Sequence, residues 1–303
     1  MTFVSYAQNF EDVLLWRALK HVAAGFYIDV GAADPREGSV TQAFYERGWR
    51  GINIEPEAFF AERLRTQRPL DLNIQMAAGA KPGKATFHRI AGTGLSTLSG
   101  EIAELHSGSD YPQSENVDVD ITTVFDLWTS NGSPDVHFLK IDVEGSERSV
   151  LEGCRLDVFR PWIVVIEATK PLSSELVREE FEDLLLGHRY ERCWFDGLND
   201  WYIPQERTKE LIQHFQSPPN PFDNFVMSSL VDEIERRKGF QADAESIFAI
   251  HGRAQERIKE LETAFHMLET SLNEANQRMT ALYETHKADQ KRIAELELAY
   301  SAR

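Results

Sequence analysis

The chain contains 303 residues, of which 42% are apolar, enough to build a substantial folded core. Acidic residues outnumber basic ones by 49 to 32, which gives a net charge of −17. This balance argues against nucleic acid and anionic membrane surfaces as partners, because both bind through clustered Lys and Arg. The sequence has no apolar run near the roughly 20 residues of a transmembrane segment, and its N-terminus lacks the features of a secretory signal. A cytoplasmic protein with two plain thiols, Cys154 and Cys193, fits this composition.

The chain divides into two regions of different composition. All twelve prolines lie before Ser228, where short apolar runs alternate with amphipathic stretches. Beyond this point Glu, Lys, Arg, Gln, Ala and Leu dominate. We therefore predict an α/β domain over residues 1–228 and a coiled-coil helix over residues 229–303.

Five short apolar runs in the first region are typical of strands buried on both faces of a parallel sheet. They are Phe26–Val30, Gly51–Ile54, Leu72–Ala77, Phe138–Ile141 and Trp162–Glu167. The helices expected between them are Ser39–Arg47, Glu57–Arg65, Glu147–Leu151 and Glu175–Leu186. This alternation predicts a doubly wound α/β sheet. An Asp-Gly turn between the β-prone runs Glu191–Phe195 and Asp200–Ile203 predicts a final antiparallel hairpin.

The second region carries a strict heptad pattern. Its a and d positions are Ile258, Leu261, Phe265, Leu268, Leu272, Ala275, Met279, Leu282, His286, Asp289, Ile293, Leu296 and Tyr300. All except His286 and Asp289 are apolar, which predicts a coiled coil with further copies of the chain or with another protein. The alternative is one amphipathic helix packed on the preceding domain, but so narrow and long a stripe suits a partner helix better.

The first two predicted strands end in residues that suit a nucleotide-like cofactor. Gly31 follows the first strand, where a glycine lets the backbone approach a ligand, although a purely structural turn is the alternative. Glu55 and Pro56 follow the second, and a carboxylate there can accept hydrogen bonds from both ribose hydroxyls of an adenosine group. These features fit NAD or S-adenosylmethionine. The missing G-x-G-x-x-G pattern favours the second, which has no pyrophosphate.

Acidic residues also follow the fourth and fifth predicted strands. Asp142 and Glu144 come after Phe138–Ile141, and Glu167 ends the next strand. Carboxylates at adjacent parallel strand ends converge, so these three are the candidate catalytic residues, with Asp142 or Glu144 as general base. A further hypothesis is that Asp142 and Glu167 share a magnesium ion. Glu147 is expected instead to cap the following helix.

Four sequence runs together resemble the FkbM family of methyltransferases. They are Ser5–Asp12, Asp29–Pro35, Gly48–Pro56 and Lys140–Glu147. The resemblance covers roughly residues 5–226. It implies a Rossmann-like class I methyltransferase sheet that ends in the antiparallel hairpin. It also implies S-adenosylmethionine as methyl donor and an oxygen nucleophile on a small sugar, glycan or polyketide-type acceptor.

The resemblance further implies roles for individual residues. Those expected to bind the cofactor are Gln8, Asp12, Asp29, Gly31, Ala33, Glu55, Pro56, Ala77 and Asp142. Among them Glu55 would hold the ribose hydroxyls, and Ala77 would lie near the adenine. Asp142 would also face the acceptor, together with Glu144.

Two segments have a structural interpretation beside the functional one. Gln8 and Asp12 would close over the cofactor under the family resemblance, but otherwise they belong to the solvated first turn of a helix. The segment Gly92–Leu98 is either a mobile loop over the cleft, with Ser96 as a contact, or a simple connector.

Two other functions remain open from the sequence. An NAD-dependent sugar oxidoreductase or epimerase would use a related sheet, but the α/β region has neither its glycine fingerprint nor its Tyr-x-x-x-Lys pair. A coiled-coil scaffold with a non-catalytic binding domain is the second alternative, and the intact strand-end acids speak against it. The heptad region suggests a further hypothesis, in which a rod holds the enzyme beside a glycosyltransferase and limits the length of a surface glycan.

Overall fold

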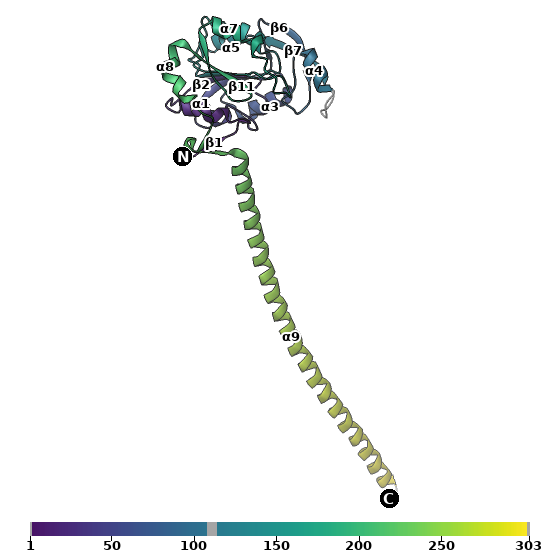
Figure 1. Cartoon of the computed structure of the whole chain (residues 1–303). Helices are drawn as coiled ribbons and strands as arrows, with labels where there is room; N and C mark the ends of the chain where they lie inside the picture. The colour runs from purple at the N-terminus through teal and green to yellow at the C-terminus, as the bar shows by residue number, and fades with distance from the viewer. Residues whose placement is uncertain (1, 108–113, 302–303) are drawn as a thin grey trace. The chain divides into compact units, whose positions relative to one another are not determined.

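The structure of the protein is a computed structural model that describes residues 2–107 and 114–301. Its backbone contacts separate two compact units, Met1–Val231 and Asp232–Arg303. The first unit is an α/β domain, and the described part of the second lies in the long helix α9, Ser228–Ser301 (Figure 1).

A seven-stranded sheet forms the centre of the α/β domain. From one edge to the other its strands are β10 (Tyr190–Phe195), β11 (Asn199–Pro204), β9 (Val164–Glu167), β8 (Phe138–Ile141), β2 (Phe26–Val30), β3 (Arg50–Ile54) and β4 (Leu72–Ile74). The strands from β9 to β4 are parallel, whereas β11 is antiparallel to both of its neighbours. The strand order reverses between β2 and β8. In open α/β sheets this reversal is the place where ligands bind.

The two faces of the sheet are covered by different helices. Alternate residues of a strand point to opposite faces, so Ile28 and Val30 of β2 join one apolar core and Tyr27 joins the other. The first core also contains side chains of α5 (Val124–Ser130), α6 (Glu147–Glu152) and α7 (Glu182–Gly187). The second contains side chains of α1 (Glu11–Leu19), α2 (Gln42–Tyr45) and α8 (Thr208–Leu211). Burial on both faces explains the continuous apolar runs of the central strands.

A smaller three-stranded sheet differs from the sequence prediction. It consists of β5 (Ala77–Ala78), β7 (Glu115–Thr122) and β6 (Gly83–Arg89), with β7 in the middle. The sequence predicted one strand over Leu72–Ala77, but β4 ends at Ile74 and the next strand pairs with β7. The predicted strand ran from β4 into β5 because Ala77 and Ala78 of β5 are apolar and buried as well.

The helix predicted over Glu175–Leu186 is wrong in its first half. The backbone N–H of Lys170 donates to the carbonyl of Glu175 at 2.8 Å, and that of Val177 donates to the carbonyl of Ala168 at 2.9 Å. These hydrogen bonds tie the segment to the chain that leaves β9, so its backbone groups are not available to a helix. Regular helix begins only with α7.

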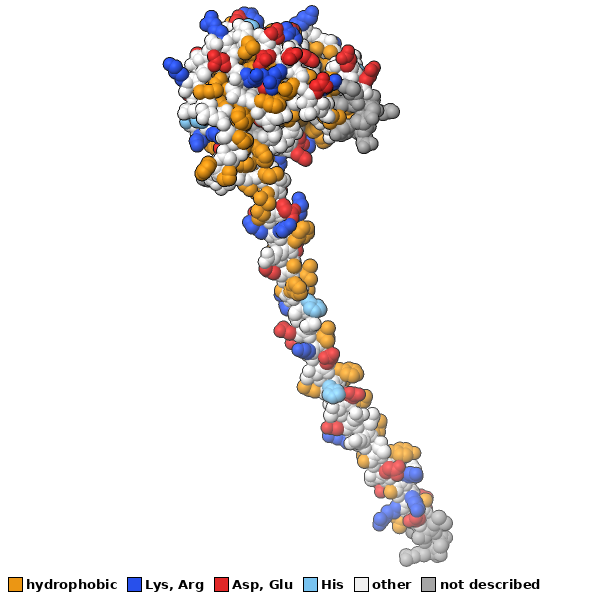
Figure 2. Space-filling model, viewed as in Figure 1, with side chains coloured by type: hydrophobic (Ala, Val, Ile, Leu, Met, Phe, Trp, Pro, Cys, Tyr) orange, Lys and Arg blue, Asp and Glu red, His pale blue; other side chains and the backbone are white. Residues whose placement is uncertain are grey.

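The remaining elements complete the domain and lead into the second unit. Helix α3 (Ala58–Gln67) follows β3, and helix α4 (Gly100–Ser107) precedes the undescribed residues 108–113. Strand β1 (Phe3–Ser5) pairs in parallel with β12 (Phe225–Met227), which directly precedes α9. Apolar side chains recur along α9 (Figure 2). Within residues 2–107 and 114–301, no helix combines the length and hydropathy needed to cross a membrane.

Candidate functional site

Two adjoining cavities open at the carboxyl edge of the sheet. The inner cavity lies between the ends of β2, β3 and β8 and the segment from Thr93 to Leu98. The second, which we call the acidic cavity, reaches from α1 past β2 and β8 to the end of β9. The two cavities share the residues Gly31, Ala33, Phe60, Gly94 and Asp142. A ligand that fills the inner cavity would therefore meet a second ligand in the acidic one.

Gly31 fixes the turn after β2 and brings it against β8. Its φ of +78° is in the left-handed region that favours glycine. A Cβ at this position would lie 1.8 Å from the backbone oxygen of Asp142, far inside any permitted contact. The glycine is therefore required by the packing of two strand ends.

Glu55 is held rigidly at the end of β3. Its two carboxylate oxygens accept hydrogen bonds from the backbone N–H groups of Ala33 at 2.9 Å and Glu57 at 2.8 Å. Burial raises the pKa of Glu55 to about 7, although these two hydrogen bonds favour the ionised form. Each carboxylate oxygen can accept a further hydrogen bond, so both can still bind a pair of ligand hydroxyls.

Most of the predicted cofactor residues meet in the inner cavity. Those that line it are Gly31, Ala33, Glu55, Pro56, Ala77 and Asp142. Apolar walls are added by Ile54, Phe60 and Phe87, which the sequence did not single out. Carboxylates beside an apolar slot suit the ribose and the flat base of an adenosyl group, so these residues fit S-adenosylmethionine.

The other predicted cofactor residues lie elsewhere. Gln8 and Asp29 line the acidic cavity, where Asp29 also accepts a hydrogen bond from the Thr41 hydroxyl at 3.0 Å. Asp12 lines neither cavity: it is fully buried and accepts hydrogen bonds from Ser5 Oγ and the Tyr6 N–H, both at 2.7 Å. The structure therefore places Asp12 away from both cavities, and its contact with the cofactor stays a prediction.

Glu11 lies in the acidic cavity in place of Asp12. Successive residues of a helix point about 100° apart, so only one of these two acids can face the cleft. Asp12 instead faces the turn that leads into α1, where it organises the N-terminal backbone.

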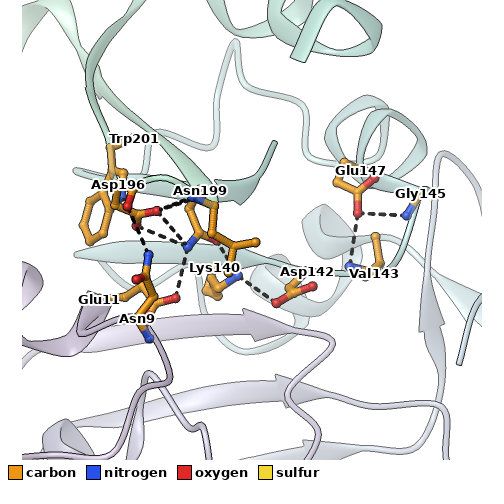
Figure 3. Close-up of polar contacts among 11 residues, drawn as sticks. Asn9, Glu11, Lys140, Asp142, Val143, Gly145, Glu147, Asp196, Asn199 and Trp201 are labelled. Carbon is orange, nitrogen blue, oxygen red and sulfur yellow. Dashed lines mark hydrogen bonds and ion pairs between the residues drawn. The ribbon is translucent and has the colours of Figure 1, made fainter. Parts of the chain in front are cut away.

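A buried lysine connects the two sides of the acidic cavity (Figure 3). Lys140 Nζ lies 3.1 Å from Asp142 Oδ2 and 3.1 Å from Asn199 Oδ1. The amide of Asn199 in turn donates to Glu11 Oε1 at 3.0 Å. Burial alone would lower the pKa of Lys140, but the carboxylates of Asp142, Glu11 and Glu167 outweigh it and raise that pKa above its ordinary value. This raised pKa favours the ammonium form of Lys140 in the site.

The three predicted catalytic acids form one cluster. One carboxylate oxygen from each of Asp142, Glu144 and Glu167 lies within 4.8 Å of the others. Burial, and then the neighbouring carboxylates, raise the pKa values of Glu144 and Glu167 well above the ordinary range, while Lys140 partly offsets this. Glu144 Oε2 is buried and has no hydrogen-bond partner among residues 2–107 and 114–301. The cluster therefore holds more carboxyl groups than Lys140 can neutralise, and it has room for a proton or a cation.

The residues around the cluster have structural contacts. Glu147 Oε1 accepts hydrogen bonds from the N–H groups of Val143 and Gly145 at 3.2 and 3.1 Å, so it stabilises the turn before α6. Ser96 lines the inner cavity and accepts a hydrogen bond from the Ile90 N–H at 2.9 Å. The segment Gly92–Leu98 is thus part of the cavity wall.

Lys140 and Asn199 were missed by the sequence prediction. A lysine in the apolar run Phe138–Ile141 was the available signal, since lysine is almost never buried unless it is paired. Asn199 carried no comparable signal, because its role depends on the hairpin that places β11 beside β9.

The sheet and its two cavities are those of an α/β protein that binds ligands where parallel strands end. The model of the methyltransferase FkbM domain matches residues 29–191, just over half of the chain. The protein therefore belongs to the FkbM methyltransferase family, which confirms the resemblance seen in the sequence.

Among the solved structures that match, we describe one, which is similar over part of the chain. It is the methyltransferase FkbM from Methylobacillus flagellatus KT, with 15% sequence identity and a TM-score of 0.37. The match covers 60% of the present chain and 44% of that protein, so the chain spans less than half of its length. A comparison with curated proteins gave no match.

Proposed function

We propose that the protein transfers a methyl group from S-adenosylmethionine to a hydroxyl oxygen of a sugar or glycan. The observation that carries this proposal is the placement of Glu55 in the inner cavity, beside the shared Gly31 turn and the carboxyl cluster. Family membership supports methyl transfer as the reaction. The choice of methyl donor is supported by the inner cavity, and the class of acceptor by the acidic cavity.

The inner cavity supports the choice of methyl donor. Glu55 would hold the ribose hydroxyls, and the apolar walls at Ile54, Phe60 and Phe87 would enclose the base. When bound, S-adenosylmethionine supplies a methyl group that is already activated. The protein's task is therefore to place the acceptor oxygen in line with it and to exclude water.

The acidic cavity supports an uncharged acceptor rich in hydroxyl groups. Seven acidic side chains and two basic ones line it. The acidic ones are Glu11, Asp29, Asp34, Glu37, Asp142, Glu144 and Glu167. Carboxylates accept hydrogen bonds from hydroxyl donors but repel phosphate and uronate groups. This favours a neutral sugar over a phosphorylated or acidic one.

The carboxyl cluster supports a base for the acceptor hydroxyl. In its ionised form Glu144 can take the hydroxyl proton on Oε2, the buried oxygen that accepts no hydrogen bond from the described part of the chain. Lys140 fixes the orientation of Asp142 through the 3.1 Å hydrogen bond. A raised pKa suits this role, because it makes a carboxylate a stronger base near neutral pH.

The same oxygens form a candidate site for a divalent cation such as Mg²⁺. Their separation and the unpartnered oxygen of Glu144 favour it, whereas the nearby Lys140 ammonium opposes it. Exhaustive chelation followed by addition of Mg²⁺ tests this part separately. Unchanged turnover after chelation would show that Asp142 and Glu144 act without a metal ion.

Calorimetry with S-adenosylhomocysteine and with NAD tests the donor. We expect binding of the first and none of the second, and Phe60→Ala should weaken that binding. Preferential binding of NAD would overturn the proposal in favour of a sugar oxidoreductase. Transfer of labelled methyl to neutral glycans, compared with uronate-containing ones, then tests the acceptor.

A further inference from the structure

Helix α9 carries an exposed apolar surface that we call the seam. It consists of the a and d positions between Ile258 and Leu296. Its nine large apolar side chains are 54% to 71% exposed. They are Ile258, Leu261, Phe265, Leu268, Leu272, Met279, Leu282, Ile293 and Leu296. At about 1.5 Å per residue the seam is roughly 58 Å long, and so long an exposed apolar stripe requires a partner.

The positions that flank the seam carry charges of opposite sign on its two sides. The e positions are Glu262, Glu269, Asn276, Tyr283, Gln290 and Glu297. The g positions are Arg257, Ala264, Ser271, Arg278, Thr285 and Arg292. Every charged e residue is therefore acidic, and every charged g residue is basic.

This separation of charge determines which partner and which direction fit. In a parallel coiled coil each g residue lies beside the e residue five positions later in the partner helix. Two parallel copies in register would pair Arg257 with Glu262 and Arg292 with Glu297, and no like charges would meet. In an antiparallel pair g faces g and e faces e, so arginines would meet arginines and glutamates would meet glutamates.

We propose that α9 forms a parallel, in-register, two-stranded coiled coil with a second copy of this chain. Leucine occupies four of the six d positions from 261 to 296, and Ile258 and Ile293 at a positions are β-branched, a combination that favours two strands. His286 and Asp289 each meet their own copy in this register. A polar layer near one end opposes shifted alignments, in which these side chains would be buried against apolar ones. Both α/β domains are then joined to the same end of this two-stranded coiled coil, which we call the rod.

Cysteine cross-linking of the full-length protein tests the direction of the helices. Ile258→Cys and Leu296→Cys lie near the two ends of the seam. In the parallel arrangement each variant forms a disulfide-linked dimer on its own under mild oxidation. In an antiparallel one, dimers form only when the two variants are mixed. Thr263→Cys, on the outer face at an f position, and the unmodified chain with Cys154 and Cys193 are the controls, and both should stay largely uncross-linked.

Charge reversal tests the recognition by the flanking residues. Arg257→Glu with Arg292→Glu places acids on both sides of the seam, and Glu262→Arg with Glu297→Arg places bases there. Each double variant should self-associate at least about tenfold more weakly, because four attractive contacts become repulsive. An equimolar mixture should associate as tightly as the unmodified chain, which a loss of helix stability alone would not produce.

Three results would overturn the inference. A chain that sediments as a monomer at micromolar concentration has no such surface. Disulfides that form only in the Ile258→Cys and Leu296→Cys mixture show antiparallel helices. A mass of three or more copies in sedimentation equilibrium contradicts the two-stranded arrangement.

Discussion

At the scale of single residues, the least expected feature of the site is the buried ammonium of Lys140. It holds Asp142 directly and reaches Glu11 through the Asn199 amide, so it connects β8, α1 and β11. Several carboxyl groups share this one cation. Its removal would leave buried negative charge without compensation, a situation that is much more costly than the loss of an exposed ion pair.

Lys140→Met is therefore expected to lower the free energy of unfolding by about 3–5 kcal/mol at pH 7. Denaturant unfolding measures this effect. The matched control is Arg148→Met, which removes exposed ion pairs with Asp183 at 2.8 Å and Glu152 at 3.1 Å and should change stability little. Equal losses in the two variants would show that Lys140 does not balance the cluster.

Glu55 gives a second prediction at this scale, for pH dependence. Its pKa of about 7 in the folded protein exceeds the ordinary value of 4.5. The group therefore contributes stability below about pH 4.5, and this contribution is lost as pH rises through 7.

Binding of ribose hydroxyls needs the ionised form of Glu55, so affinity for S-adenosylhomocysteine should rise about tenfold between pH 6 and pH 8. Calorimetry at several pH values measures it, and Glu55→Gln should bind more weakly without this slope. A pH-independent affinity of the unmodified chain would refute the assignment.

At the scale of elements, the junction between the β2 turn and the end of β8 determines the shape of both cavities. Gly31 and Gly38 both have a φ in the left-handed region, +78° and +71°. A Cβ on Gly31 would collide with the Asp142 backbone, whereas a Cβ on Gly38 would meet nothing within 4 Å. Substitution of Gly31 and of Gly38 therefore separates the cost of the left-handed backbone conformation from the cost of a steric clash.

Gly38→Ala is expected to cost about 1 kcal/mol of stability through its backbone conformation alone. Gly31→Ala should cost at least about 2 kcal/mol more, because β2 and β8 must move apart. It should also abolish binding of S-adenosylhomocysteine. Thermal unfolding and calorimetry of the two variants check this, and equal effects would show that the contact between the strand ends is not required.

At this scale, some strands and site residues could be predicted from the sequence and others could not. The central strands β2, β3, β8 and β9 were predictable because burial on both faces leaves a continuous apolar run. The small sheet was not, since β7 is largely exposed and alternates Val with Asp. Residues at strand ends were found because topology alone brings them together. The contacts of Asn199 depend on packing between distant segments, and those of Asp12 depend on how the turn before α1 folds back on the helix. Neither is recorded in a local sequence pattern.

At the scale of the whole molecule, the α/β domain and the rod make separate contributions. We propose that the first folds and binds its cofactor without the second, since the two units divide at Val231. A chain that ends at Val231 should keep its affinity for S-adenosylhomocysteine within about twofold and lose self-association. Calorimetry and sedimentation measure the two properties. A truncated chain that fails to bind would show that association is part of the site. If the rod also places the enzyme beside a glycosyltransferase, truncation should alter glycan length and spare small acceptors.

The polar layer of the seam gives the last prediction. His286 and Asp289 are the only polar members of the a and d series between Ile258 and Leu296. In a parallel dimer two Asp289 carboxylates approach each other, which is unfavourable for association. His286→Ile with Asp289→Leu should therefore raise the midpoint of thermal melting of the rod, followed by helix circular dichroism, and tighten association at least about tenfold.

The matched control, Glu284→Ile with Lys291→Leu, adds the same side chains at outer f positions and should not tighten association. The apolar variant should also populate species of higher mass, because the layer that fixes register and strand number has been removed. If association weakens instead, these two side chains stabilise the dimer, and a favourable contact between His286 and Asp289 of the two helices would be the reason.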